Sequence, residues 1–252
     1  MNYVTSTNPT SLEDCHFYHS TDLPISGTVK GDWDLRGRVS PYLGKVDFNG
    51  KRVFDVGCAS GFLSFEMEKR GASEVVSLDA SSVKQINFLP VKSFWDNFDN
   101  WAETPEASAF LVRMKNSYWF AHREFGSNAK AWYGDIYNIP AELGMFDVVV
   151  VAQILVHLRD PIKALWSAAD RCSETLIIAE GMIESSQPMM KFISGRHNGA
   201  SANWWHLTTS LYDEILFIMG FEIQSVSTAR YRCNVANQDI PITTIVARRR
   251  HA

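Results

Sequence analysis

The chain has 252 residues, of which 46% are hydrophobic and 21% charged, with a formal net charge of -4 at pH 7 and a pI near 6.0. This composition is that of an ordinary globular protein, and it excludes disordered, collagen-like and disulfide-scaffold classes. The negative charge gives no overall attraction to nucleic-acid phosphates, although the tail "ARRRHA" is basic, so tRNA is a disfavoured partner that stays open.

The N-terminal stretch "MNYVTSTNPTSLEDCHFYHS" lacks the basic flank and apolar core of a signal peptide. The longest apolar run, residues 148–156, is too short to cross a bilayer. We therefore expect a soluble, cytoplasmic protein with no membrane partner. The cysteines contain no CxxC pair, which predicts free thiols and no metal site; they are Cys15, Cys58, Cys172 and Cys233.

From Lys51 onward, short apolar runs alternate with helical patterns, which predicts a parallel sheet with helices on both faces. The run "FDVVVVAQ" is typical of a strand buried on both faces. The expected strands are 51–57, 74–80, 129–135, 146–153 and 174–181, followed by a C-terminal antiparallel hairpin of 221–233 and 239–250.

Helix boundaries carry their own signals. The pattern predicts a helix over 62–72 that ends at Gly71, and one over 207–220 that ends at Gly220. Asp160 and Pro161 form an N-cap and a first-turn proline for a helix over 161–172.

Two segments fall outside this alternation. Residues 1–50 precede the first strand, and residues about 90–128 contain one helix with an apolar face marked by Phe110, Met114, Tyr118 and Ala121. We expect an N-terminal cover segment over 1–50 and a catalytic domain over 51–252 with a helical insertion. Both segments are expected to cover the ligand crevice at the carboxyl ends of the strands.

The stretch "VFDVGCASG" joins the first strand to a helix through a glycine turn. A helix N-terminus offers unpaired N–H groups, and glycines let a ligand approach the backbone closely. A dinucleotide site would show G-x-G-x-x-G, but here Gly57 and Gly61 flank Cys58, Ala59 and Ser60. This weakens the interpretation as a pyrophosphate site.

Three carboxylates near the predicted strand ends point to a different ligand. Asp55 lies two residues before Gly57, where a carboxylate repels a phosphate but suits an ammonium group. Asp79 ends the second strand and can accept hydrogen bonds from a ribose diol. Asp135 is placed to bind an adenine amino group, with Ile136 packed on the ring. A ligand with an ammonium, a ribose and an adenine but no phosphate is S-adenosylmethionine.

The sequence over roughly residues 50–250 resembles the class I S-adenosylmethionine-dependent methyltransferases, through "VFDVGCASG" and the final hairpin. More narrowly, residues 17–39, 146–165 and 203–222 resemble the tRNA 5-hydroxyuridine carboxymethyltransferase group and its uncharacterised methyltransferase relatives.

The resemblance implies a Rossmann-like, seven-stranded methyltransferase sheet of the α/β class. It places the methionine moiety on Asp55 and the glycine turn, the ribose on Asp79, the adenine at Asp135 and Ile136, and the sulfonium beside Gln153. The cofactor-binding residues that it implies are Asp55, Gly57, Cys58, Ala59, Gly61, Asp79, Ala80, Asp135, Ile136, Gln153 and Trp33.

Methyl transfer is an in-line displacement, so a general base is needed only where the acceptor must lose a proton early. His157, in "LVHLRDP", is the first candidate for this catalytic role and His206, in "NWWH", the second. The alternative for His157 is a bracing contact in its loop. Trp204 and Trp205 either form the wall of an acceptor pocket or pack the cover on the core.

Further candidate acceptor contacts are Tyr18, His19, Arg196 and Asn203. Asp32 and Arg36 lie in the same N-terminal cluster, where an Asp–Arg pair is more often structural than a ligand contact. The Cys58 thiol is better explained as a small side chain that fits the turn than as a nucleophile.

The sequence thus predicts methyl transfer from S-adenosylmethionine to an oxygen, or as a second choice a nitrogen, of a small-molecule or sugar-like acceptor, with a homo-oligomer left open. Three alternatives remain. Carboxymethyl transfer to a tRNA wobble uridine would need a cation for the extra carboxylate, for which Lys30 and Arg36 are candidates. An NAD-dependent oxidoreductase is disfavoured by Asp55, and a regulatory protein without turnover is the third.

Overall fold

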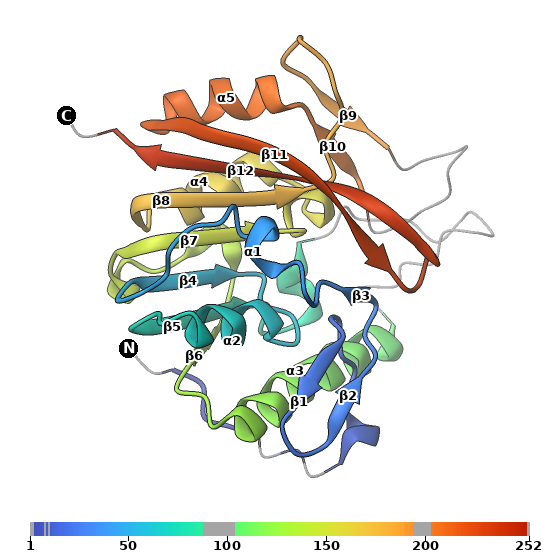
Figure 1. Cartoon of the computed structure of the whole chain (residues 1–252). Helices are drawn as coiled ribbons and strands as arrows, with labels where there is room; N and C mark the ends of the chain where they lie inside the picture. The colour runs from blue at the N-terminus through green and yellow to red at the C-terminus, as the bar shows by residue number, and fades with distance from the viewer. Residues whose placement is uncertain (1–2, 8, 10, 88–103, 194–202, 251–252) are drawn as a thin grey trace.

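The computed structural model describes residues 3–7, 9, 11–87, 104–193 and 203–250. A mixed sheet of eight strands runs through the molecule in the order β3-β11-β12-β8-β7-β4-β5-β6 (Figure 1). Strands β4 to β8 are parallel, and the β11–β12 hairpin is antiparallel. The predicted sheet and hairpin are confirmed, and β3, from the N-terminal segment, is an eighth strand. The strands are β3 (Trp33–Asp34), β4 (Arg52–Val56), β5 (Glu74–Asp79), β6 (Lys130–Tyr133), β7 (Phe146–Ala152), β8 (Cys172–Glu180), β11 (Phe221–Cys233) and β12 (Gln238–Arg249).

Helices cover both faces of this sheet. Side chains that alternate along β7 separate the two cores: Val148 and Val150 pack with α1, α2 and α3, whereas Val149 and Val151 pack with α4 and α5. Burial on both faces explains the unbroken valine run. The helices are α1 (Val39–Tyr42), α2 (Phe62–Lys69), α3 (Pro105–Phe125), α4 (Pro161–Ala169) and α5 (Thr209–Ile218).

The capping residues that the sequence predicted are found at the helix ends in the structure. The Asp160 carboxylate accepts a hydrogen bond from the Lys163 N–H at 2.9 Å, with Pro161 as the first residue of α4. Gly71 and Gly220 follow α2 and α5 in the left-handed conformation. The insertion contains α3, with Tyr118 and Ala121 on its buried face, while residues 90–103 of that prediction lie outside the described residues.

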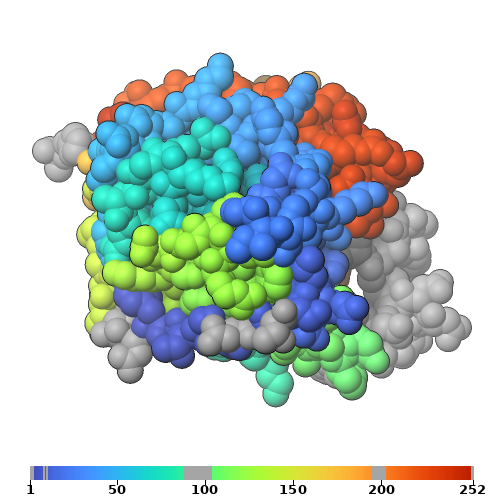
Figure 2. Space-filling view, turned by 60° about the horizontal axis from the view of Figure 1, so that its bottom comes forward, coloured from blue at the N-terminus to red at the C-terminus, as the bar shows by residue number. Residues whose placement is uncertain are grey.

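The N-terminal segment forms the hairpin of β1 (Thr21–Leu23) and β2 (Gly27–Val29), preceded by the short helix η1 (Leu12–Asp14). It packs on α3 (Figure 2). It also joins the edge of the sheet through β3, which pairs with β11. The Tyr18 N–H donates to Ser60 Oγ at 3.1 Å, inside the glycine turn. This hydrogen bond ties the N-terminal segment to the start of α2.

The sequence interpretation of 203–206 as a loop is wrong. β10 (Trp205–Leu207) pairs antiparallel with β9 (Met190–Phe192), with Trp205 opposite Phe192. Helix α5 therefore begins only at Thr209, capped by Thr208, two residues later than predicted. Short, exposed strands of this kind have no clear two-residue periodicity, so their pairing is not visible in the sequence.

In the described part of the chain, no helix combines the length and the apolar character that a membrane span requires.

Ala59 provides a test of the turn. It has a φ of +48°, in the left-handed region that costs an L-residue roughly 1–2 kcal/mol. We expect Ala59→Gly to relieve this strain, offset in part by the greater freedom of glycine in the unfolded chain. The net gain should be about 0.5–1 kcal/mol in the free energy of unfolding, measured by urea denaturation. An unchanged or lower stability would show that the alanine methyl group makes compensating contacts.

Candidate functional site

A cavity lies where the carboxyl ends of four adjacent parallel strands meet. The space between its walls is about 340 Å³, part of it open to solvent. Its position, where the chain leaves β4, β5, β6 and β7, is that of ligand sites in open α/β sheets. It is lined by Gly57, Leu78, Asp79, Ala80, Gln85, Ile86, Gly134, Ile136, Ile154 and Leu158.

The glycine turn is fixed by hydrogen bonds to the end of β5. The Gly57 and Cys58 N–H groups both donate to the Leu78 carbonyl, each at 2.9 Å. The Ala59 N–H donates to Asp79 Oδ2 at 2.8 Å, and the Ala80 N–H donates to Oδ1 at 2.7 Å. Asp79 therefore both lines the cavity and holds the turn.

Electrostatics at the turn depend on burial. Burial raises the pKa of Asp79, against its two backbone N–H donors, which favour the charged form. Burial also raises the pKa of the Cys58 thiol well above its usual range, so this side chain is neutral. A neutral thiol supports the interpretation of Cys58 as a small side chain that fills the turn, not as a nucleophile.

Gly61 shows why a glycine is required at the start of α2. Its φ is +82°, and a Cβ on it would lie 2.6 Å from a ring carbon of Tyr118. Gly57, at φ +85°, would bring a Cβ to 3.1 Å from the Ile154 side chain. The turn, α3 and the loop after β7 therefore approach one another through these two glycines.

Asp55, near the end of β4, is buried against α2. Its carboxyl group is 1% exposed and accepts a hydrogen bond from Ser64 Oγ at 2.6 Å, in the first turns of α2. Burial raises the pKa of Asp55 to about 6. It is not among the residues that line the cavity, so its contact is with the helix that follows the turn.

Ile136 lines the cavity, whereas Asp135 caps the short helix η4 (Ile136–Asn138). The Asp135 carboxylate accepts from the Tyr137 N–H at 3.0 Å and from the amides of Asn87 and Asn138 at 2.9 and 2.6 Å. These bonds join the loops that follow β5 and β6.

Gln153 is held in an uncommon conformation at the end of β7. Its φ is +52°, its N–H donates to the Ala179 carbonyl at 2.9 Å, and its buried Nε2 has no hydrogen-bond partner among the described residues. Strained backbone next to an unpaired polar group is typical of functional sites.

The N-terminal segment brings Tyr18, His19 and Trp33 together beside Ser60. The Trp33 N–H donates to the Tyr18 carbonyl at 2.9 Å. Burial lowers the pKa of His19 to about 4 and raises that of Tyr18 to about 12, so both side chains are neutral. His19 Nδ1 has no partner among the residues that the structure describes.

The two tryptophans attach the β9–β10 pair to η6 (Leu155–His157). The Trp204 N–H donates to the Val156 carbonyl at 2.8 Å, and Trp205 Nε1 donates to the Leu158 carbonyl at 2.9 Å. Trp205 also packs on Phe192 with 5.1 Å between ring centroids. These contacts are those expected if the tryptophans serve for packing and do not form the wall of an acceptor pocket.

The two candidate bases lie on different elements, His157 in η6 and His206 in β10. His157 ends η6, where its N–H donates to the Ile154 carbonyl. Burial, and secondarily Lys191, lowers the pKa of His206, which faces Gly181 after β8. Asn203 is exposed, and Arg196 lies outside the described residues.

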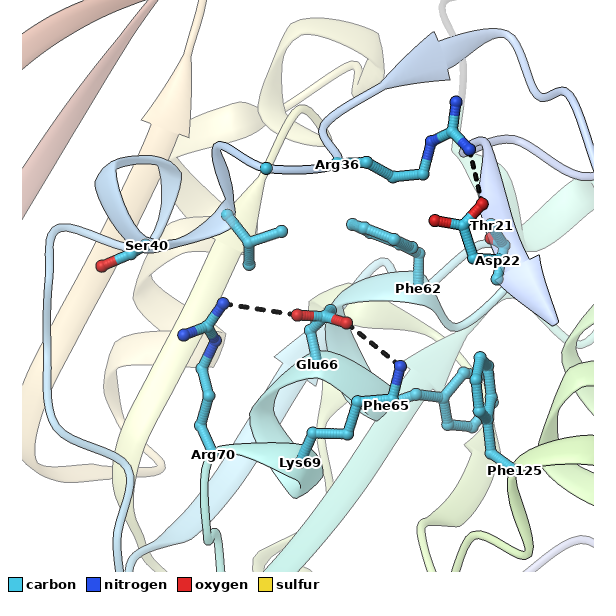
Figure 3. Close-up of a pocket in the computed structure, with 12 residues that line it drawn as sticks. Thr21, Asp22, Arg36, Ser40, Phe62, Phe65, Glu66, Lys69, Arg70 and Phe125 are labelled. Carbon is cyan, nitrogen blue, oxygen red and sulfur yellow. Dashed lines mark hydrogen bonds and ion pairs between the residues drawn. The ribbon is translucent and has the colours of Figure 1, made fainter. Parts of the chain in front are cut away.

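A second hollow, of about 690 Å³, lies on the outer side of α2 (Figure 3). Its charged groups are already paired: Glu66 accepts from Lys69 and Arg70, and Arg36 binds Asp22 and also Asp34 outside it. Because it is away from the strand ends, it is not the candidate site.

The suggested Asp32–Arg36 pair is wrong: Asp32 instead contacts His16, at 3.1 Å. Arg36 is closer to the carboxylates of Asp22 and Asp34, which the β1–β2 hairpin and the turn after β3 place beside it.

Sequence reasoning missed several of the cavity residues. Gln85 and Ile86 lie in the helix η2 (Val83–Ile86) after β5, and Ile154 and Leu158 follow β7. Their position after predicted strand ends was the available signal.

All four cysteines are buried and free. In the described part of the chain, no three His, Cys, Asp or Glu side chains form a metal-binding group.

A family model described as "Methyltransferase domain" matches residues 34–207. The chain belongs to this family.

Among its relatives are two tRNA U34 carboxymethyltransferases. That of Alcanivorax borkumensis is 28% identical over 62% of this chain and 41% of its own length. That of Alteromonas mediterranea is 24% identical over 81% of this chain and 54% of its own length. The chain therefore spans only about half the length of these relatives.

Solved methyltransferase structures share the fold. Magnesium protoporphyrin IX methyltransferase of Synechocystis, solved with bound SAM, has a TM-score of 0.53 at 15% identity and covers 84% of this chain and 76% of its own. The 1,6-didemethyltoxoflavin-N1-methyltransferase of Burkholderia thailandensis has a TM-score of 0.52 at 12% identity, over 84% and 75%. The predicted methyltransferase resemblance and Rossmann-like fold are confirmed.

Asp55 predicts a pH dependence of stability. Because its pKa in the folded protein lies near 6, above the ordinary carboxyl value, its stabilising contribution is present at low pH and is lost as the pH rises through 6. The free energy of unfolding of the wild type, relative to Asp55→Asn, should fall by about 2–3 kcal/mol between pH 4 and 7, measured by urea denaturation.

The exposed Asp213→Asn on α5 serves as the matched control and should show no such relative change. A pH-independent difference between the wild type and Asp55→Asn would mean that Asp55 ionises normally.

Proposed function

We propose that this protein binds S-adenosylmethionine in the strand-end cavity and transfers its methyl group to an oxygen, or as a second choice a nitrogen, of a small-molecule or sugar-like acceptor. The observation that carries the proposal is the combination of a glycine turn that lacks the full G-x-G-x-x-G pattern of a pyrophosphate site with a carboxylate, Asp79, at the end of the next strand. The methyltransferase family and the SAM-bound neighbour support it.

The cavity walls suit the adenosine part of this cofactor. Each Asp79 oxygen accepts one backbone hydrogen bond and keeps a lone pair for a ribose hydroxyl. Ile86, Ile136 and Leu158 offer apolar surface for an adenine ring. The backbone of 58–61 would hold the methionine part. Asp55 would act through Ser64, by fixing α2 behind the turn.

The N-terminal segment would enclose the reacting end. Tyr18, His19 and Trp33 are held beside the glycine turn by Ser60 and by the backbone bonds of β3. These side chains are neutral, with His19 buried and Tyr18 and Trp33 half-buried. They would exclude water without adding charge, which favours the displacement of a cationic sulfonium.

The positions of the candidate cations argue against the alternative of carboxymethyl transfer, which the relatives' names suggest. The two cations considered for the extra carboxylate do not line the cavity: Lys30 is exposed, and Arg36 is paired with Asp22 and Asp34 on the outer side of α2. A buried acid, Glu180, lies instead at the end of β8. A methyl donor therefore fits this site better than a carboxylated one.

The acceptor side has an apolar edge. Met190 is 37% exposed and Phe192 is 48% exposed on β9, next to the two tryptophans. This edge, with the overall charge of -4, fits a small acceptor with an apolar portion better than an RNA backbone. His157 and His206 are the candidate bases that the sequence suggested.

Isothermal titration with S-adenosylmethionine, S-adenosylhomocysteine, carboxy-S-adenosylmethionine and NAD tests the proposal. We expect the first two to bind, NAD not to bind, and carboxy-S-adenosylmethionine to bind at least tenfold more weakly. Asp79→Asn should weaken the first two at least tenfold, which is about 1.4 kcal/mol.

Asp239→Asn, an exposed acid on the β11–β12 hairpin, is the control and should bind as the wild type does. Binding of NAD alone would overturn the proposal, and a preference for the carboxylated donor would move tRNA carboxymethylation to first place.

A further inference from the structure

Glu180 is a buried acid that the sequence analysis did not single out. It is the last residue of β8 and is 2% exposed. Its Oε1 accepts hydrogen bonds from the backbone N–H groups of Ile154 and Leu155, at 3.0 and 2.9 Å. Its Oε2 is buried and has no hydrogen-bond partner among the described residues.

No positive side chain compensates this carboxyl group in the described part of the chain. Burial raises its pKa to about 8, and among the residues that the structure describes, the two backbone N–H donors alone favour its charged form. The titratable groups that interact electrostatically with it are Tyr18 from the N-terminal segment, Tyr42 from α1 and Tyr212 from α5. Burial raises the pKa of each of these tyrosines, and the charge of Glu180 adds to that effect. Such an acid destabilises the fold unless something else supplies a counter-charge.

Glu180 is connected to the cavity through the loop that follows β7. It holds the N–H of Ile154, and the Ile154 side chain lines the cavity opposite Gly57. The neighbouring strand end carries Gln153, whose Nε2 is also buried and unpartnered within the described ranges. Two unsatisfied polar atoms thus lie at the ends of the neighbouring strands β7 and β8, on either side of the loop that carries Ile154 into the cavity wall.

We propose that Glu180 is the counter-charge for the sulfonium of the donor and then accepts the proton of the acceptor. This inference rests on the proposed function. In the reaction, a lone pair of the acceptor oxygen forms the bond to the methyl carbon, and the carbon–sulfur bond breaks with its electron pair left on sulfur. The proton of the acceptor hydroxyl goes to Glu180 Oε2.

The inference can be tested without knowing the acceptor, because S-adenosylmethionine carries a sulfonium cation and S-adenosylhomocysteine does not. The sulfonium cation should ionise Glu180, so binding of S-adenosylmethionine should release close to one proton near pH 7. Binding of S-adenosylhomocysteine should release none. The affinity ratio of the two ligands should rise up to tenfold per pH unit toward pH 8 and then level off.

The measurement is isothermal titration of the full chain with each ligand between pH 6 and 9, in two buffers of different ionisation enthalpy, which counts the protons. Glu180→Gln should abolish the difference between the ligands. Glu174→Gln, on the same strand and paired with Lys51 at the surface, should keep it.

Equal proton release by both ligands in the wild type would overturn the inference even if the Glu180 variant does not fold. A release that persists in Glu180→Gln would also overturn it. If neither ligand binds, the proposed function fails and this inference falls with it.

Discussion

The hydrogen bonds between the glycine turn and the end of β5 determine the rest of the site. Three successive N–H groups, from Gly57 to Ala59, are directed at Leu78 and Asp79. This pairing forces left-handed backbone at Gly57 and Ala59 and places the start of α2 over the sheet. The N-terminal segment then attaches to the same turn through Ser60, so the position of the cover depends on the turn as well.

Burial explains why the charges at the site behave as they do. Asp55, Asp79 and Glu180 all have raised pKa values because burial excludes water from them. Hydrogen bonds from Ser64 or from backbone N–H groups, and for Asp79 also the charge of Lys115, offset this effect only in part. Acids in this state cost stability in the free protein. A cationic ligand of the kind proposed would recover part of that cost on binding, which links the fold to the choice of ligand.

The fold was largely predictable because its signals are local. The valine run of β7, the cap at Asp160 and the glycines after α2 and α5 each act within a few residues. The β9–β10 pair was missed because short edge strands owe their pairing to contacts with η6, which lies far away in the sequence.

The cavity lining was predictable only close to the strand ends: Asp79 is the last residue of β5, and Ile136 lies three residues after β6. Whether a side chain points into the cavity or into a helix depends on strand twist and packing, so Asp55 was not recognised as a partner of Ser64. Glu180 looked like any acid at the end of a strand, and only its burial and its unpaired oxygen distinguish it.

The central claim is that the strand-end cavity holds S-adenosylmethionine, and a crystal structure of the protein grown with S-adenosylhomocysteine tests it most directly. We expect the ribose within hydrogen-bonding distance of Asp79, the adenine against Ile136, and the sulfur on the side of Gln153 and Glu180. A ligand bound elsewhere, for example in the hollow outside α2, or a ribose away from Asp79, would contradict it.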